Sequence, residues 1–338
     1  MTDSTMKALR LGTRRSKLAM AQSGQVAETV RELTGRPVEL VEITTYGDTS
    51  REHLAQIGGS GVFVSALRDA LLAGEIDFAV HSLKDLPTAQ PQDLVLAAIP
   101  VREDPRDALI ARDGLRFEEL PDGARVGTGS PRRMSQLNAW ARALGKRIET
   151  VPIRGNIDTR IGFVEKGELD AVVLAAAGLT RIGRIDAATQ LLSPDMVLPA
   201  PGQGALAIEC AADRADLIAM LAELDDPVTR AAVTAERSLL AALEAGCSAP
   251  VAALADLSPS SRLCSSRGGP KADEQAVTEM HLRGVVGTTD GSAAVQLSTT
   301  GHVPASLDDE SVPLTMGREL AAEMLAKGAA GLMGERAL

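Results

Sequence analysis

The chain has 338 residues, which is too long for one ordinary domain and predicts two or three. Hydrophobic residues make up 45% of it, but with one Trp, one Tyr and four Phe the cores must be built from Ala, Val, Leu and Ile. The net charge of −10 argues against nucleic acid as a partner, because phosphate binding needs a basic face.

Targeting and metal signals are not found in the sequence. No apolar run reaches the roughly 18–20 residues that cross a bilayer. The first residues lack the apolar core and cleavage site of a secretory signal, so we expect a cytoplasmic protein without a membrane partner. Cys210, Cys247 and Cys264 form no C-x-x-C pair and the four histidines are scattered, which predicts neither a disulfide framework nor a metal site.

Strand-like and helix-like patterns alternate through the first 210 residues, as in an α/β protein. The first series consists of strands at 9–12, 38–45, 78–81 and 94–99, with helices at 17–33 and 62–72. Gly35 and Gly74 end the two helices. The polar, proline-broken segment 101–107 then predicts a crossing between domains.

A second α/β series follows, with strands at 125–127, 150–153 and 171–175 and helices at 132–144 and 157–165. The segment PAPGQGALAIEC, residues 199–210, places a Pro/Gly-rich hinge before another strand. Two α/β lobes joined by two crossings are typical of a hinged ligand-binding cleft.

The pattern changes after a helix at 228–243. Antiparallel strands are predicted at 251–257, 280–286 and 293–299, with a last helix at 316–325 and a mobile insertion of low apolar content at 258–275. The fold class is therefore α/β, with two lobes around a cleft plus a third, C-terminal α+β domain. We place domain 1 at 1–103 and 201–224, domain 2 at 104–200 and domain 3 at 225–338.

Basic residues stand where helices are predicted to begin. In GTGSPRR, Ser130 suits an N-cap and Pro131 the first helical position, which places Arg132 and Arg133 in the first turn. A helix start already carries partial positive charge, so each cation there costs roughly 0.3–1 kcal/mol. Helix stability alone would favour acidic residues in the first turn. The presence of arginines there therefore indicates a functional role for them.

The same placement recurs at three other strand-to-helix junctions, with Arg14 and Arg15, with Lys84, and with Arg154 and Arg160. Ligands of open α/β sheets bind beyond the carboxyl ends of the strands, and guanidinium groups clamp carboxylates. One such arginine would be a solvated surface residue, but the group predicts a ligand with several negative charges. Phosphate and carboxylate both remain possible, although the P-loop pattern G-x-x-x-x-G-K-[ST] is absent.

Asp85 stands among these cations. It is either a local counter-ion or turn-former, or an ionised carboxylate that stabilises positive charge developing on a substrate. We interpret His81 as a packed, hydrogen-bonded residue rather than a base, and Cys210 as a core residue. Cys247 lies in an accessible turn where a thiol can react, although an isolated cysteine is usually structural.

Nine motifs, in this order, resemble those of the porphobilinogen deaminase family, also called hydroxymethylbilane synthases. They are LRLGTRRSKLA, GGSGVFV, FAVHSLKDLP, REDPRDA, GTGSPRR, IRGNIDTR, LPAPGQGALAIEC, TAERSLL and LEAGCSAPV, collinear from about Leu9 to Leu257. The resemblance implies a transferase of tetrapyrrole and heme biosynthesis. It would join four porphobilinogens, with loss of ammonia at each step, and then release hydroxymethylbilane by hydrolysis.

The resemblance also implies a dipyrromethane cofactor, one per chain, attached to Cys247 by a thioether. Asp85 would be catalytic: it would hold the pyrrole N–H groups and stabilise the cationic methylene-pyrrolenine left when ammonia departs. The other cofactor-binding residues would be Ser82, Lys84, Thr128, Ser130, Arg132 and Arg133. Substrate-binding residues would be Arg14, Arg15, Arg154, Arg160 and Gln203.

A lid loop is implied at Gly58, Gly59, Ser60, Gly61 and Phe63, although Gln56 and Ser60 stand where many family members have lysine. The apolar content of the third domain gives no reason to expect more than a monomer. Two other functions are compatible with a two-lobed anion site: a non-catalytic binding protein for an anionic small molecule, and a transferase without a covalent primer. The GC-x-x-P motif and the missing secretion signal count against the first of these.

Overall fold

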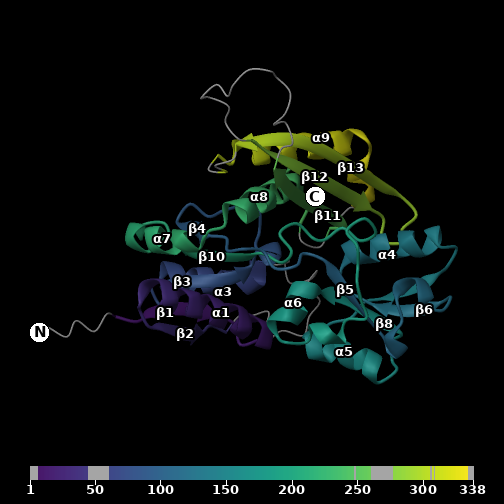
Figure 1. Cartoon of the computed structure of the whole chain (residues 1–338), viewed down its shortest axis with the longest axis horizontal. Coiled ribbons are helices and arrows are strands. Elements are labelled where there is room, and N and C mark those ends of the chain that lie inside the picture. Colours follow the sequence, from purple (N-terminus) through teal and green to yellow (C-terminus); the bar gives the residue numbers. More distant parts are fainter. Residues whose placement is uncertain are drawn as a thin grey trace, which may run out of the picture. The chain divides into compact units, whose positions relative to one another are not determined.

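The computed structural model describes residues 7–44, 61–246, 249–259, 277–304, 307 and 309–333, and of residues 61–63, 259 and 277 it describes the backbone alone (Figure 1). The chain divides into two compact units. One comprises Met1–Gly129, Lys146–Ser193 and Gln203–Asp226, and the other comprises Ser130–Gly145, Pro194–Gly202 and Pro227–Leu338.

The first unit contains a five-stranded sheet of order β2-β1-β3-β10-β4. Its strands are β1 (Leu9–Thr13), β2 (Val38–Glu42), β3 (Phe78–Ser82), β4 (Leu94–Ala98) and β10 (Leu206–Ala211). β1 is parallel to both β2 and β3, whereas β10 is antiparallel to β3 and β4. The parallel strands therefore end together at one edge, where Ser82 closes β3.

Helices cover this sheet on both faces, because successive residues of β3 point to opposite sides. Phe78 and Val80 join a core with α1 (Lys17–Thr34), whereas Ala79 packs in a second cluster with α3 (Gly61–Leu72). The helix α7 (Ala215–Leu221) also contributes to the first core. A strand buried on both faces explains why β3 opens with the continuous apolar run Phe78, Ala79 and Val80 rather than with an alternating pattern.

A second sheet of the same unit has the order β7-β6-β8-β5-β9. It contains β5 (Asp107–Ala111), β6 (Ala124–Gly127), β7 (Ile148–Val151), β8 (Ala171–Ala175) and β9 (Gln190–Leu191), with α5 (Ile157–Glu165) and α6 (Ala176–Arg181). β6 is parallel to β7 and β8, and β5 is antiparallel to β8 and β9. The two sheets thus share one plan: three parallel strands, then an antiparallel strand beside the third of them, β10 in the first sheet and β5 in the second.

The second unit contains α4 (Pro131–Ala143), α8 (Pro227–Ala242), the antiparallel strands β11 (Val251–Pro259), β12 (Val277–Gly287) and β13 (Ala294–Pro304), and α9 (Ser311–Ala326). Val251, Ala253 and Ala255 share a core with α8 and α9, which lie along the sheet (Figure 1). The alternate residues Ala252 and Leu254 pack with Leu198 instead. The predicted fold class is confirmed: two α/β sheets and a C-terminal α+β part.

Local signals for helix ends are also confirmed. The Ser16 hydroxyl accepts a hydrogen bond from the Ala19 N–H at 3.2 Å and so caps α1, whose other end is Gly35 at φ 65°. The Asn156 side chain caps α5 by accepting from the Thr159 N–H at 2.8 Å. Ser130 stands at the N-cap of α4 with Pro131 inside the first turn, as predicted, although the Ser130 side chain forms no capping hydrogen bond.

Several predicted boundaries are wrong. The segment 101–107 was expected to be a polar crossing, but β5 begins at Asp107, whose side chain is fully buried. β7 lies two residues earlier than expected, β2 ends at Glu42, and α6 and α7 were not predicted. Asp107 can be buried there because its carboxylate accepts a hydrogen bond at 2.8 Å from the amide of Gln203, a residue 96 positions away.

Within the part of the chain that the structure describes, no helix combines the length and apolar character needed to cross a bilayer.

Candidate functional site

The carboxyl end of β3 leads directly into the turn that carries Asp85, the predicted catalytic residue. A single 3-10 turn, Leu83–Asp85, follows Ser82. The Leu83 side chain is buried and its N–H donates to the Ala205 carbonyl at 3.0 Å, while the Ser82 hydroxyl accepts from Gln22 Nε2 at 2.9 Å. Asp85 ends the turn with an exposed side chain that forms no hydrogen bond or ion pair with any other described residue. An anchored turn therefore presents a carboxylate to its surroundings.

Lys84 and Gln203 lie together at this end of the sheet. Lys84 Nζ lies 3.5 Å from Gln203 Oε1. The Gln203 amide is fully buried, and its Nε2 donates to the Pro105 carbonyl at 2.7 Å and to Asp107 Oδ1 at 2.8 Å. These contacts fix which way the amide points, so its oxygen faces the ammonium group of Lys84.

The crossing segment around Gln203 is held at close range. Arg102 Nε donates to the Gln203 carbonyl at 2.8 Å, and Arg181 Nη2 donates to the Gly204 carbonyl at 2.6 Å. Gly204 has φ 89°, and a Cβ there would collide with the Glu103 carbonyl oxygen, so only glycine suits this position. Burial lowers the pKa of the Arg181 guanidinium, which the charge of Glu103 partly offsets.

The arginines at the start of α4 are buried, unlike typical surface cations. Arg132 is 3% exposed and Arg133 is 5% exposed, and the first turn of α4 contains no acidic residue. Arg132 Nη1 donates to the Leu198 carbonyl at 2.7 Å, and Gln136 exchanges two hydrogen bonds with the same residue. In the first unit, Thr128 is likewise fully buried, and its N–H donates to the Val151 carbonyl at 2.9 Å.

The four arginines predicted to bind substrate are placed differently from one another. Arg15 is exposed and its Nε lies 3.2 Å from Glu42 Oε2, which gives it a structural partner. Arg14 is half-buried at the end of β1, and Arg154 is exposed after β7. Arg160, in α5, donates from Nε to the Gly155 carbonyl at 2.9 Å.

Several predicted site residues lie outside the described residues. They are Cys247, which was expected to carry the cofactor, and Gly58, Gly59 and Ser60 of the lid, together with the insertion at 258–275 beyond Pro259. Gly61 and Phe63 open α3, where only the backbone is described. Cys210, expected in the core, is fully buried in β10, and burial raises the pKa of its thiol to about 11.

Sequence reasoning missed a buried polar cluster next to the turn Leu83–Asp85. Glu209 on β10 is fully buried and accepts from Arg68 at both oxygens, from Nε at 3.1 Å and from Nη2 at 2.8 Å. His81 is 6% exposed and is therefore a packed residue, as predicted, but its Nε2 lies 3.2 Å from Glu209 Oε2 without forming the predicted hydrogen bond. Gln90 Nε2 donates to Glu209 Oε1 at 3.3 Å. The available signal was a single carboxylate in the apolar run ALAIEC.

The charges around Glu209 keep it ionised. Burial raises the pKa of its carboxyl, but the close approach of His81, the hydrogen bonds from Arg68 and the charges of both lower it by more, so the pKa lies below the ordinary value. Among the described residues, no group of His, Cys, Asp and Glu side chains could hold a metal ion.

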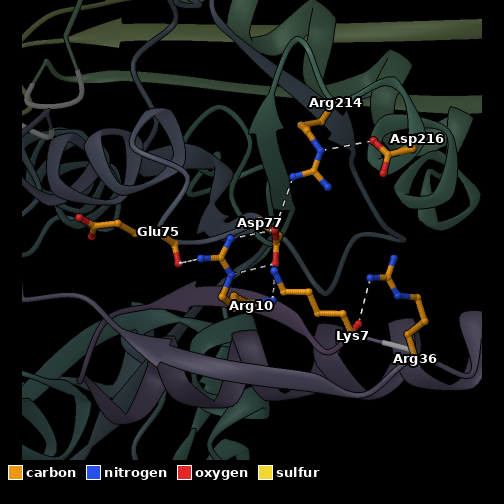
Figure 2. A network of polar contacts seen from close by, with 7 residues as sticks. All are labelled: Lys7, Arg10, Arg36, Glu75, Asp77, Arg214 and Asp216. Atoms are coloured by element: carbon orange, nitrogen blue, oxygen red, sulfur yellow. Dashed lines mark hydrogen bonds and ion pairs between the residues drawn. The ribbon is translucent and has the colours of Figure 1, made fainter. Parts of the chain in front are cut away.

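A different polar network lies at the amino ends of β1 and β3, the end of the sheet opposite Asp85. Arg10, on β1, donates from Nε and Nη2 to the two oxygens of Asp77 at 3.2 and 3.1 Å, and its backbone N–H donates to the same carboxylate at 2.8 Å. Figure 2 shows Arg214 reaching Asp77 from the other side, with its own contact to Asp216. This cluster satisfies its charges internally, which is typical of a structural network.

The chain matches two family models. One, described as porphobilinogen deaminase, dipyromethane cofactor binding domain, covers residues 9–219, and the other, porphobilinogen deaminase, C-terminal domain, covers residues 230–326. The chain is 77% identical over 335 residues to porphobilinogen deaminase 1 of Streptomyces avermitilis, covering 98% of each chain. It is 54% identical over 329 residues to porphobilinogen deaminase of Thermobifida fusca, covering 97% of this chain and 96% of that one.

Among solved structures the similarity is lower. An ABC transporter periplasmic substrate-binding protein from Coxiella burnetii is 10% identical with a TM-score of 0.41, covering 66% of this chain and 94% of that chain. The second substrate binding domain of a putative amino acid ABC transporter from Streptococcus pneumoniae is 16% identical with a TM-score of 0.40, covering 64% and 91%.

Proposed function

Because this chain belongs to the porphobilinogen deaminase family, we propose that it joins four porphobilinogen molecules into a linear tetrapyrrole and then frees hydroxymethylbilane by hydrolysis. Each addition breaks the C–N bond of the aminomethyl group, whose nitrogen takes up a proton and leaves as ammonia with the bonding electrons. One C–C bond forms between the pyrroles, and the accepting pyrrole carbon loses its hydrogen as a proton, so that one ammonia is released per bond formed. The chain would thus be a transferase of tetrapyrrole and heme biosynthesis. The observation that carries the proposal is the 77% identity over 335 residues to a protein named for this activity.

The donor set is suited to the dipyrromethane cofactor named by the family model that matches residues 9–219. Each pyrrole of this group carries two carboxylates, and carboxylates are bound best by guanidinium, ammonium and hydroxyl donors. Buried Arg132 and Arg133, in a helix turn without acidic residues, meet this requirement. We propose that these two residues, with Ser82, Lys84, Thr128 and Ser130, hold the carboxylates, and that Cys247 carries the group through a thioether.

When bound, the dipyrromethane supplies the pyrrole carbon to which the first substrate is joined. The chain's own contribution at the reacting end would come from Asp85, whose carboxylate is exposed beyond β3. It can accept the pyrrole N–H and oppose the positive charge that develops as ammonia leaves. Electrostatic stabilisation of this kind is worth roughly 10²–10³ in rate.

Carboxylates of incoming and added pyrroles would be bound by Arg14, Arg15, Arg154, Arg160 and Gln203, with residues 58–63 acting as a lid. Arg154→Ala should then stall elongation, which intact mass would detect as accumulated partial products, while thermal stability changes little because Arg154 is exposed. Normal elongation with a large loss of thermal stability would assign this arginine a structural role instead. The three-domain boundaries, a cytoplasmic location and a monomeric state belong to the same proposal.

The test is to supply the purified full chain with porphobilinogen, measure ammonia and hydroxymethylbilane, and record the intact mass. We expect turnover and a mass excess equal to two linked pyrroles, which Cys247→Ser abolishes. The matched control is Cys210→Ala, which removes the buried thiol of β10 and should keep the excess. Absence of ammonia release would favour a non-catalytic binding protein, and a bare-chain mass in active protein would refute the covalent cofactor.

A further inference from the structure

Glu209 touches both ends of the segment that carries Asp85. Its Oε2 lies 3.2 Å from His81 Nε2 on one side of the turn, and its Oε1 accepts from Gln90 Nε2 at 3.3 Å on the other. Asp85 lies between these two contacts, four residues after His81 and five before Gln90. One buried carboxylate thus ties together the two ends of a ten-residue segment.

The carboxylate is itself held rigidly. It sits on β10, which lies between β3 and β4, and the two hydrogen bonds from Arg68 form a fork with fixed geometry. Arg68 belongs to α3, so the same atoms link the sheet, the helix and the catalytic turn. Gln90 is fixed further, because its Nε2 also donates to the Leu94 carbonyl at 3.1 Å.

Asp85 depends on such support because its own side chain is exposed and has no described partner. Its location is therefore set by the backbone on either side, which is held by the Leu83 N–H on the Ala205 carbonyl and the Leu86 N–H on the Leu83 carbonyl. Displacement of a catalytic group by about 1 Å can cost on the order of 100-fold in rate.

We propose that Glu209 is a positioning residue for Asp85, which fixes the segment from His81 to Gln90 at both ends and so presents the catalytic carboxylate in one place. This inference rests on the proposed function, since it needs Asp85 to be the group that acts on the substrate. Glu209 itself is buried and touches no substrate. Its role is exerted through His81, Gln90 and Arg68.

The experiment compares Glu209→Gln with Asp77→Asn, a matched control that removes an arginine-paired carboxylate at the opposite end of β3. We expect Glu209→Gln to lower kcat by roughly 10–100-fold with KM changed less than about threefold, and to keep the mass excess. Asp77→Asn should leave kcat within about twofold of wild type even if it lowers Tm as much. If Glu209→Gln and Asp77→Asn lowered Tm equally and also lowered kcat equally, the proposal would be overturned.

Non-additivity gives a readout that a general loss of stability would not produce. In an Asp85→Asn background, Glu209→Gln should lower the remaining rate by less than about threefold, because there is no longer a carboxylate to position. The same factor in both backgrounds would overturn the proposal. If Glu209→Gln does not fold, Arg68→Lys, which keeps the charge but loses the fork, should show a smaller fall with the same non-additivity.

Amide hydrogen exchange separates this inference from the proposed function. Residues 83–90 should exchange roughly tenfold faster in Glu209→Gln but not in Asp77→Asn, whether or not porphobilinogen is the substrate. Unchanged exchange in Glu209→Gln would refute the positioning role. A wild-type chain that releases no ammonia from porphobilinogen would instead refute the proposed function.

Discussion

Asp77 and Asp85 lie at the two ends of one strand, β3, and their surroundings are opposite. Asp77 precedes the strand and its side chain is 11% exposed between Arg10 and Arg214, whereas Asp85 follows the strand by three residues and is exposed. Burial raises the pKa of the Asp77 carboxyl, but the hydrogen bonds from Arg10 and the charges of Arg10 and Arg214 lower it by more. At the amino end of β3 the Asp77 carboxylate is therefore occupied by structural contacts. At the carboxyl end the Asp85 carboxylate remains available.

This difference separates a carboxylate that is already paired within the fold from one that remains available to a ligand. A carboxylate that already accepts hydrogen bonds at both oxygens has little capacity left for a ligand, and its partners would have to be displaced. The Asp85 carboxylate can still accept hydrogen bonds from a ligand. Its segment contacts Glu209 through His81 and Gln90, whereas its own side chain has no described partner. An exposed acid on a well-anchored turn is the arrangement that charge stabilisation in catalysis requires.

The sharpest test of the comparison is Asp85→Asn, which keeps size and removes charge. We expect kcat to fall by roughly 10²–10³, equivalent to about 3–4 kcal/mol of transition-state stabilisation. Tm should change little, because Asp85 has no partner among the described residues. Steady-state ammonia release and thermal unfolding measured on one preparation check both halves. Near-normal turnover would remove Asp85 from its proposed role.

Asp77→Asn should show the reverse pattern. Loss of the charge-assisted hydrogen bonds from Arg10 should lower the free energy of unfolding by roughly 1.5–3 kcal/mol, while turnover stays near that of the wild type. Urea unfolding together with the rate assay measures both quantities. A rate loss comparable to that of Asp85→Asn would mean that the two ends of β3 are not functionally distinct.

Much of the fold could be predicted because local signals agree with it. The 3.6-residue pattern and the capping residues Ser16 and Asn156 placed α1 and α5 within a residue or two, and the continuous apolar run of β8 was placed correctly. β5 was missed because it begins at a charged residue, Asp107, whose buried carboxylate accepts a hydrogen bond from Gln203, 96 positions away, and no local pattern contains such a contact.

The candidate site shows the same limit. Motifs and strand ends placed Ser82, Lys84 and Asp85 on one turn, as the structure has them. Glu209 was missed because its partner Arg68 is 141 residues away in sequence, and only the strand order β3-β10-β4 brings β10 beside the turn. Pairings across a mixed sheet of this kind are not encoded in the spacing of nearby residues.

The pH dependence of the unfolding free energy should also distinguish Asp77 from Asp85. Because its folded pKa is lower than its unfolded value, its ionised form contributes stability that is fully present above about pH 4–5. That contribution is lost as the pH falls through the folded pKa. The difference in unfolding free energy between wild type and Asp77→Asn should therefore shrink below about pH 4. In an Arg10→Ala background most of this pH dependence should vanish, and its persistence would point to another partner.

Arg214→Ala is expected to have the smallest effect on the network. Arg214 is 40% exposed, and its Nη1 lies 3.5 Å from Asp77 Oδ1, beyond the distances at which Arg10 forms its fork. Exposed ion pairs contribute at most about 1 kcal/mol and are screened by salt, so the loss should fall further in 0.5–1 M salt. Urea unfolding of Arg214→Ala and Arg10→Ala at two salt concentrations checks the ranking. Equal losses of unfolding free energy would mean that Asp77 is stabilised by the positive charges around it rather than by the forked hydrogen bonds of Arg10. Asp77→Asn would then be a poorer control for Glu209→Gln, because Glu209 is held by the fork of Arg68.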